Sequence, residues 1–555
     1  MRNTMRKNNL LNRNPELAFR VSERISELYH SGITTNTGVA RIIKDEFPLA
    51  FDDVESARSH VRKKVSYLKA DNPAPVSSKP ENDEPLSSDF LLAQKRKTDV
   101  SHYYIVTWGQ NNTPVFTPFW DNILLYAKTI GASIHVIAGR YHNPTSLLYD
   151  NSEEKWADIL LPYLDASVHD IHDRVRIVSN IKTQPTNNTP LSGMESVAQG
   201  KTCVFGHPRC HMKTVASLYG NGINDDSVYS LNPQFLFTTG AVTIPNYTDS
   251  RTGAKGHFHH TYGFVIIELL DDGTYRIRQV KACKDGSFTD LYWNFSKDGV
   301  KRVVSVKGIV FGDVHSAKLS PLALDRMLSM VDLFSPEYVV LHDIFDGESI
   351  NPHEKDNPFK EYFRKKQGRN LLSHEIAHTT DIVNVFSQIT KVVVVNSNHD
   401  YFLEKYIINS DWKKDVDNAP EYMKYSLAII EGKTPKGLLP YLIELRATNK
   451  DRVICLGVDE SFIIGNRECG QHGHLGVSGS KGSPSQLRKL SSKNTTGHTH
   501  SPLRIDGLTV VGCQDIFHGY NKGASNWWLC DDLIHEDNKD QQILHLGKTL
   551  TSIEI

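Results

Sequence analysis

YVVLHDIFD, at positions 338–346, is the stretch of sequence that decides the expected fold of the second half of the chain. Its first four residues are apolar and rich in β-branched side chains, which predicts a buried strand. Polar residues follow at once, so Asp343 and Asp346 are expected just past the carboxyl end of that strand. In an open α/β sheet, ligands bind at this edge.

Four further motifs repeat this arrangement, since each places Asp, His or Asn after an apolar stretch. Residues i and i+2 of an extended segment point the same way, so two ligands spaced in this manner can hold one ion. The N and O ligands suit two divalent metals that share one carboxylate. The four motifs are Gly312-Asp313-Val314-His315, Ser397-Asn398-His399-Asp400, Gln471-His472-Gly473-His474 and Gly497-His498-Thr499-His500.

Strands and helices alternate through residues 301–555, which predicts an α/β sheet with covering helices. Helices are expected at 322–334 and 359–389. Strands are expected at 303–311, 338–341, 391–395, 453–456, 462–464 and 508–511.

Residues 100–300 are expected to form a second, separate α/β domain. A strand at 103–107, a helix at 118–130 and a strand at 132–138 predict a parallel βαβ unit. A hairpin is expected to turn at 271–273. The segment contains no phosphate-binding glycine loop and no dinucleotide fingerprint, so its sequence assigns it no role.

Residues 1–70 predict a small helical module, with a second helix at 38–47 and a basic third helix that begins near residue 52. The module carries 13 Lys and Arg against 8 Asp and Glu, a net charge of +5. Three short helices with a basic last one resemble a helix-turn-helix module, which implies DNA contact. The alternative is an ordinary solvated helical surface. The candidate contacts are Arg58, Arg62, Lys63 and Lys64.

A linker is expected at 71–99, because this segment is rich in Pro, Ser and charge. Over the whole chain, 39% of residues are apolar and the net charge is −1, which is typical of a soluble protein without a general basic field. The seven scattered Cys favour a reducing compartment. No apolar run approaches the roughly 20 residues of a membrane span, so we expect a cytoplasmic protein without a membrane partner. A homo-oligomer is compatible with the sequence but is not derivable from it.

Taken in order, the five motifs resemble the calcineurin-like metallophosphoesterase superfamily over about 200 residues, from roughly 305 to 512. The resemblance implies that superfamily's α/β sandwich fold. It also implies two metal sites bridged by Asp343. The first site would take Asp313, His315 and His500, and the second would take Asn398, His472 and His498.

The resemblance further implies that His399 is catalytic and not a ligand. It would contact the phosphate and protonate the leaving oxygen, while Asp346 would orient its imidazole. The chain has His342 where the superfamily usually has Gly, so His342 is a possible phosphate contact. His474 is an alternative to His472 as the ligand, and it is otherwise another possible phosphate contact or a loop cap.

The implied activity is phosphodiester hydrolysis by hydroxide activated between two divalent ions. The resemblance favours Mn²⁺, with Fe²⁺, Zn²⁺ and Mg²⁺ as alternatives. Gly347 and Asp400 depart from the protein phosphatases and favour the nuclease branch, so DNA is the expected substrate. The overall arrangement is also similar to proteins that certain enterobacterial siphophages make early in infection to degrade DNA in the host cytoplasm.

Two other functions stay open. One is a nucleotide or cyclic-nucleotide phosphodiesterase, which would have no need of residues 15–69. The other is a DNA-binding regulatory protein whose metal domain is inactive.

Overall fold

The computed structural model describes residues 100–146, 154–217, 233–354, 357–515 and 523–546, and parts of the first 61 residues. Within that first stretch, the described positions are 20–21, 24–25, 27–28, 36–48, 50–51, 57–58 and 61. The chain forms two compact units, Met1–Asp83 and Glu84–Ile555. Each unit is described by itself.

The first unit contains α3 (Asn36–Glu46), which confirms the helix expected at 38–47. Its core is a small apolar cluster that includes Val21, Ile25 and Ile43. Arg58 is partly buried, and its contact with DNA stays a prediction. The other three candidate DNA contacts, Arg62, Lys63 and Lys64, lie outside the described residues.

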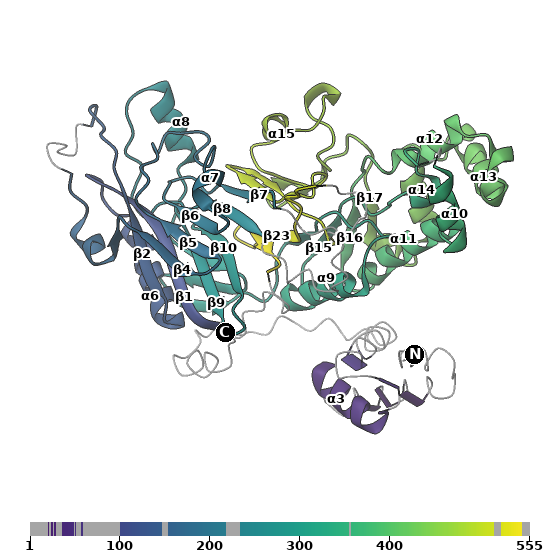
Figure 1. Cartoon of the computed structure of the whole chain (residues 1–555), viewed down its shortest axis with the longest axis horizontal. Coiled ribbons are helices and arrows are strands. Elements are labelled where there is room, and N and C mark those ends of the chain that lie inside the picture. Colours follow the sequence, from purple (N-terminus) through teal and green to yellow (C-terminus); the bar gives the residue numbers. More distant parts are fainter. Residues whose placement is uncertain are drawn as a thin grey trace. The chain divides into compact units, whose positions relative to one another are not determined.

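The second unit is of mixed α/β type, as the sequence predicts, and the first three metal motifs follow strands of a six-stranded sheet (Figure 1). Four neighbouring strands run parallel, and two antiparallel strands complete the opposite edge. In spatial order the strands are β17 (Val453–Cys455), β16 (Lys391–Val394), β15 (Tyr338–Leu341), β14 (Gly308–Val310), β23 (Cys530–Ile534) and β24 (Asp540–Leu544).

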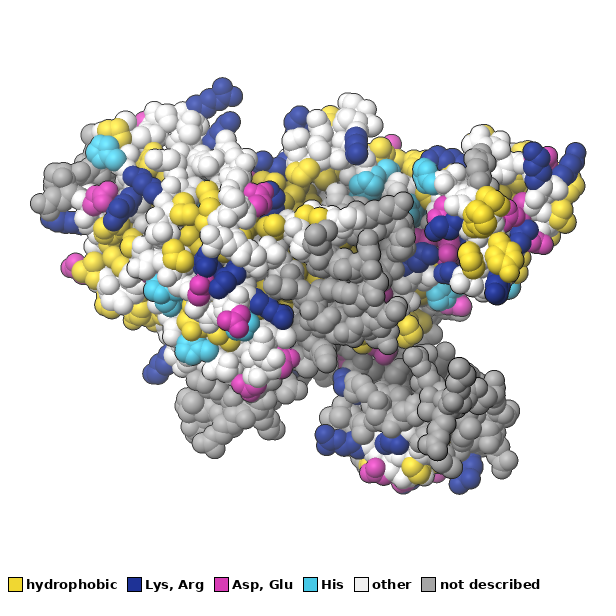
Figure 2. Space-filling view, viewed as in Figure 1, with side chains coloured by type: hydrophobic (Ala, Val, Ile, Leu, Met, Phe, Trp, Pro, Cys, Tyr) yellow, Lys and Arg dark blue, Asp and Glu magenta, His cyan; other side chains and the backbone are white. Residues whose placement is uncertain are grey.

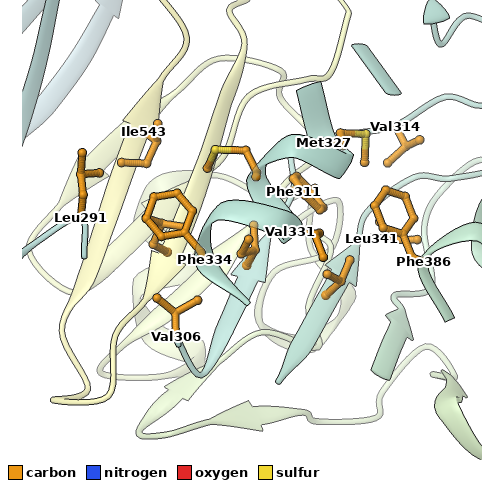
Figure 3. Packing of buried hydrophobic residues seen from close by; sticks show 14 of the residues in the cluster. Leu291, Val306, Phe311, Val314, Met327, Val331, Phe334, Leu341, Phe386 and Ile543 are labelled. Carbon is orange, nitrogen blue, oxygen red and sulfur yellow. The ribbon is translucent and has the colours of Figure 1, made fainter. Parts of the chain in front are cut away.

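Helix α9 (Pro321–Phe334) follows β14 and packs against the sheet. It begins where the Ser320 hydroxyl accepts a hydrogen bond from the amide of Ala323 at 3.2 Å, and Pro321 suits the first turn. Figure 3 shows apolar side chains from α9 and from the sheet strands meeting in the core. Burying each such side chain stabilises the fold by about 1.5–3 kcal/mol, so this packing fixes the strand ends that carry the metal motifs.

The helix expected at 359–389 is two helices, α10 (Pro358–Lys366) and α11 (Leu372–Ser387). Gly368 separates them with a φ of +68°, a left-handed conformation that glycine adopts without strain. The strand expected at 303–311 is shorter than predicted, because β14 covers only its last part. The remaining helices of this region are α12 (Tyr401–Asn409), α13 (Ala419–Ile430), α14 (Leu438–Arg446) and α15 (Pro484–Leu490).

A five-stranded sheet confirms the βαβ unit expected near residue 100. Strand β1 (Val100–Gln110), helix α6 (Thr117–Ile130) and strand β2 (Ser133–Gly139) follow in order, and β1 pairs with β2 in parallel. The predicted hairpin is also present as β9 (Gly263–Leu270) and β10 (Tyr275–Lys281). The fifth strand is β3 (Leu164–Asp165), and a small separate sheet contains β11 (Phe288–Asp290), β12 (Trp293–Ser296) and β13 (Gly299–Arg302).

A ten-stranded sheet crosses the domain boundary expected at residue 300. Strand β7 (Met212–Val215) pairs antiparallel with β21 (Leu503–Ile505), so strands from both halves form one sheet. Residues 100–300 are therefore part of the same compact unit as the metal motifs. The pairing covers two strand edges that would otherwise be exposed. The other strands are β18 (Ile463–Ile464), β19 (Arg467–Glu468), β20 (Asn494–Thr496), β22 (Leu508–Val510), β8 (Gln234–Thr238), β6 (Thr202–Phe205), β5 (Val175–Val178) and β4 (Val168–His172).

Two short helices, α7 (Glu195–Ala198) and α8 (Arg251–His259), lie in this half of the unit. Within the described parts of the chain, every helix is too short or too polar to span a membrane.

Candidate metal centre

The predicted metal ligands gather where strands β14, β15 and β16 end. Their loops are joined by backbone hydrogen bonds, since the amide of Val314 donates to the carbonyl of His342 at 3.0 Å and that of His315 donates to Asp343 at 2.9 Å. The later motifs come from the neighbouring sheet, where the amide of Gly497 donates to the carbonyl of His472 at 2.8 Å. Segments far apart in sequence are therefore held side by side at one edge.

The first group of ligands consists of Asp313, His315, Asp343 and His500, all of them buried. The Nε2 atoms of His315 and His500 lie 3.0 Å apart. Nε2 of His500 is 3.1 Å from Asp313 Oδ2, and Nε2 of His315 is 3.4 Å from Asp343 Oδ2. These atoms converge on one point, so the four side chains could hold a metal ion.

A second group lies on the other side of Asp343. Nε2 of His472 is 3.1 Å from the side-chain oxygen of Asn398, and the ring centroids of His472 and His498 are 5.2 Å apart. Oδ2 of Asp343 lies 3.8 Å from Nε2 of His472. Since the same oxygen is near His315 of the first group, Asp343 lies between the two groups, as a shared carboxylate must.

Burial sets the charges of these side chains. It raises the pKa of Asp343 to about 6, together with the neighbouring carboxylate of Asp313. Burial lowers the pKa of His472 well below its usual value, so its imidazole is neutral, as a metal ligand must be. Burial also opposes ionisation of Asp313. Nearby His side chains, of which His472 contributes most, outweigh this effect and hold the pKa of Asp313 far below its usual value.

Buried polar atoms at this centre fit the presence of a cation. Among the described residues, Oδ1 of Asp343 and Nδ1 of His472 have no hydrogen-bond partner, although both side chains are buried. Leaving such atoms unsatisfied costs free energy. Divalent cations would satisfy the carboxylates, and the mixture of His, Asp and Asn suits transition metals. The donor set therefore fits the group that the motifs predict.

Four of the ligand residues have a left-handed backbone: φ is +46° at His315, +46° at Asp343, +76° at His498 and +56° at His500. In residues with a side chain, this conformation costs of order 1–3 kcal/mol and occurs mainly at functional sites. The amide of His498 donates to both carboxylate oxygens of Asp313, at 3.1 and 2.9 Å, and so helps to hold the turn. The strain directs the side chains toward one centre.

Gly497 is required at this centre, because a Cβ atom there would lie 2.1 Å from Oδ1 of Asp313. We expect Gly497→Ala to displace Asp313 and to lower phosphodiester hydrolysis about 100-fold, the effect of a displacement of about 1 Å. The measurement is hydrolysis of bis-p-nitrophenyl phosphate in Mn²⁺. Gly457→Ala is the control, since its nearest neighbours, atoms of Lys436, are 3.6 Å away. Equal activity of the two variants would contradict this role of Gly497.

His399 lies beside the first group. Its ring centroid is 4.9 Å from that of His315, and its ring stacks on Phe402 at 4.8 Å. With 18% of its side chain exposed it is more accessible than the buried ligands, a position that suits contact with substrate. Phe402 was not predicted from the sequence.

The contact expected between Asp346 and His399 is replaced by another one. Oδ1 of Asp346 lies 3.1 Å from Nδ1 of His315, so the carboxylate orients a metal ligand through its second ring nitrogen. Burial opposes ionisation of Asp346, but His315, His399 and Lys318 together outweigh it and lower the pKa of Asp346 to about 2. Asp346 still lies close enough to His399 for the three side chains to form a further possible metal-binding group.

Asp400 holds the loop that carries Asn398 and His399. Its carboxylate accepts hydrogen bonds from the Ser397 amide at 3.0 Å and from the Ser397 hydroxyl at 2.8 Å. These contacts fix the backbone at Ser397, directly before Asn398.

The two possible phosphate contacts both lie next to the second group. The ring centroids of His342 and His474 are 5.6 and 5.5 Å from that of His472. His342 is fully buried and His474 is partly buried, and burial lowers the pKa of each to about 4. Contact of either ring with a phosphate stays a prediction.

A cavity of about 730 Å³ opens beside this centre. Asp346, Asn398 and His399 line it on the side of the metal centre. Its other walls come from the segment after β15 and from α10 and α12. The sequence pattern does not predict these walls, because they consist of segments that no single motif connects.

The chain is similar to Protein A1 of Escherichia phage T5. The two are 28% identical over 499 residues, which cover 83% of this chain and 86% of the phage protein. No family model and no solved structure matches the chain. The expected relationship to a phage protein is confirmed at this level, while the metallophosphoesterase assignment rests on the motifs and on the geometry of the centre.

Proposed function

We propose that this chain is a two-metal phosphodiesterase that hydrolyses DNA. One observation carries the proposal: a single oxygen of Asp343 lies 3.4 Å from His315 of one ligand group and 3.8 Å from His472 of the other. A carboxylate in this position is what two neighbouring divalent ions require. The superfamily that the motifs resemble uses this arrangement in an α/β sandwich.

The two ligand groups would hold the ions, and Mn²⁺ is the metal that the resemblance favours. When bound, the ions neutralise the phosphate charge and lower the pKa of a bound water. The ligands' own contribution is to present neutral imidazoles and ionised carboxylates at fixed positions. The first group is Asp313, His315, His500 and Asp343, and the second is Asn398, His472, His498 and Asp343.

His399 is the residue that would act on the substrate. It borders both the metal centre and the cavity, and stacking on Phe402 fixes its ring. From this position it would contact the phosphate and donate a proton to the leaving oxygen. Asp346 would fix the tautomer and orientation of His315, because its carboxylate lies 3.1 Å from the second nitrogen of that ring.

DNA is the substrate that the rest of the chain supports. The net charge of +5 in residues 1–70 suits contact with phosphates. Similarity to Protein A1 of phage T5 supports a phage-encoded protein, and we propose that it acts on host DNA in the cytoplasm of the infected cell. One observation favours the alternative of a nucleotide phosphodiesterase: the cavity volume of about 730 Å³ is within the range for small-molecule sites.

Metal removal tests the proposed function. We expect the purified protein to cut supercoiled and linear double-stranded DNA in Mn²⁺, to lose this activity in EDTA, and to regain it when Mn²⁺ is restored. Hydrolysis of bis-p-nitrophenyl phosphate should follow the same pattern. Activity on the small substrate without DNA cleavage would favour the nucleotide phosphodiesterase. Inactivity on every substrate would contradict the enzyme and favour a DNA-binding protein with an inactive metal domain.

A further inference from the structure

Helix α10 exposes aromatic side chains among basic ones. Phe359, Tyr362 and Phe363 are 75%, 59% and 52% exposed. The nine residues of the helix include four Lys and Arg and only one acidic residue. Figure 2 shows hydrophobic side chains among Lys and Arg over the part of the molecule where Figure 1 places α10. Clustered apolar surface of this kind marks binding sites, and basic residues beside aromatic ones are typical of sites for single-stranded nucleic acid.

One of these aromatic side chains belongs to the cavity at the metal centre. Phe363 lines that cavity together with Asn398 and His399. Phe359, on the same helix and even more exposed, is not part of its lining. A ligand held at His399 would therefore extend toward Phe363, and not toward the rest of the aromatic surface.

The cavity lining has an excess of positive charge. Five Lys and Arg line it against three Asp and Glu. Two glutamates each contact two of the cations. These contacts are Glu348 with Lys318 (3.0 Å) and Arg369 (3.3 Å), and Glu354 with Lys360 (3.2 Å) and Arg364 (3.7 Å).

Lys405 is the fifth cation of this lining. Its Nζ lies 5.6 Å from the centre of the Phe402 ring, and no carboxylate of the described residues lies within 4.0 Å of it. Its charge is thus available to a phosphate that enters the cavity. Phosphates attract such a charge without regard to base sequence.

We propose that this cavity holds one unpaired nucleotide of the DNA strand being cut. The base of this nucleotide stacks on Phe363. The phosphate on the side of the nucleotide away from the metal centre lies near Lys405. The inference rests on the proposed function and deepens it, since it requires the nucleotide beside the cut to be unpaired, either in a single strand or after local opening of a duplex. A paired base remains stacked inside its duplex and offers no face to a side chain, whereas every unpaired base has a face that an aromatic ring can contact.

The test compares two single strands of equal length, an oligothymidylate and an abasic oligonucleotide built on tetrahydrofuran units. We expect the full-length protein in Mn²⁺ to prefer the oligothymidylate about 10-fold in kcat/KM, the size of one base–aromatic stack. Phe363→Ala should abolish the preference, and Phe363→Tyr, which keeps the ring, should retain it. Phe359→Ala is the matched control and should also retain it. Because both positions are more than half exposed, neither substitution should alter folding.

Each other outcome has a definite meaning. A wild-type protein without the preference, or a Phe363→Ala variant that keeps it, overturns the inference and leaves DNA hydrolysis standing. The aromatic surface would then suit a protein partner. Hydrolysis of bis-p-nitrophenyl phosphate without cleavage of either oligonucleotide overturns both the inference and the DNA assignment. Inactivity on all three substrates overturns the proposed phosphodiesterase.

Discussion

Asp343→Asn is expected to lower the hydrolysis of bis-p-nitrophenyl phosphate in Mn²⁺ by about 1,000-fold or more, because a two-metal centre supplies several kcal/mol of transition-state stabilisation. The substitution keeps the shape of the side chain but removes the charge that serves both ligand groups. Its oxygen lies 3.4 Å from His315 and 3.8 Å from His472, so both groups should lose affinity together. The measurement combines the hydrolysis rate with the amount of Mn²⁺ that the protein retains.

The melting temperature of the variant distinguishes a loss of catalysis from misfolding. Burial raises the pKa of Asp343 to about 6, above its usual 3.8. Without metal, ionisation of Asp343 therefore costs folding free energy. This cost grows as the pH rises from 3.8 to about 6 and beyond. At pH 7 the metal-free variant should melt no lower than the wild type. Asp332→Asn, an exposed change on α9, is the control and should leave the rate unchanged. A variant at Asp343 that retains a tenth of the activity would refute the shared carboxylate.

His399→Gln is expected to lower DNA cleavage by about 100-fold or more, the usual contribution of a positioned general acid. Bound Mn²⁺ should be unchanged, because His399 is not one of the proposed ligands. The loss should be smaller on bis-p-nitrophenyl phosphate, because p-nitrophenolate leaves without needing a proton, whereas the sugar oxygen of DNA needs one. The measurement is the ratio of the two rates in the wild type and the variant.

The control for His399 is His374→Gln, an exposed histidine on α11. It should leave both rates and their ratio unchanged. Equal losses on the two substrates in His399→Gln would contradict proton donation and leave only a positioning role. Unchanged rates on both would remove His399 from the reaction.

Local features of this fold were predictable from the sequence because they depend on neighbouring residues. The strand expected at 338–341 is β15 with the same bounds, since an apolar β-branched run ends where polar residues begin. The same reasoning placed Asp313, Asp343 and Asn398 after successive strands. Parallel neighbours end at one edge of a sheet, so Asp313, His315 and Asp343 meet there. His500 joins them from the neighbouring ten-stranded sheet and completes one metal-binding group.

Contacts between distant segments were not predictable in the same way. The hydrophobic pattern shows that a segment is buried but not which strand it pairs with, so the pairing of β7 with β21 was missed. The partner of Asp346 was assigned by resemblance, and the side chain contacts His315 instead of His399. The place of Phe363 beside His399 likewise depends on how α10 packs, which its basic and aromatic composition does not specify.

The continuous sheet formed by β7 and β21 limits how this gene can evolve. Exchange of coding sequence between related genes succeeds where few contacts cross the junction. A junction near residue 83 would lie at the boundary between two compact units, Met1–Asp83 and Glu84–Ile555. A junction near residue 300 would pair β7 from one ancestor with β21 from another, although each strand was selected to pair with the strand of its own ancestor. Residues 84–555 should therefore be inherited as one block, while the basic first unit is free to be replaced.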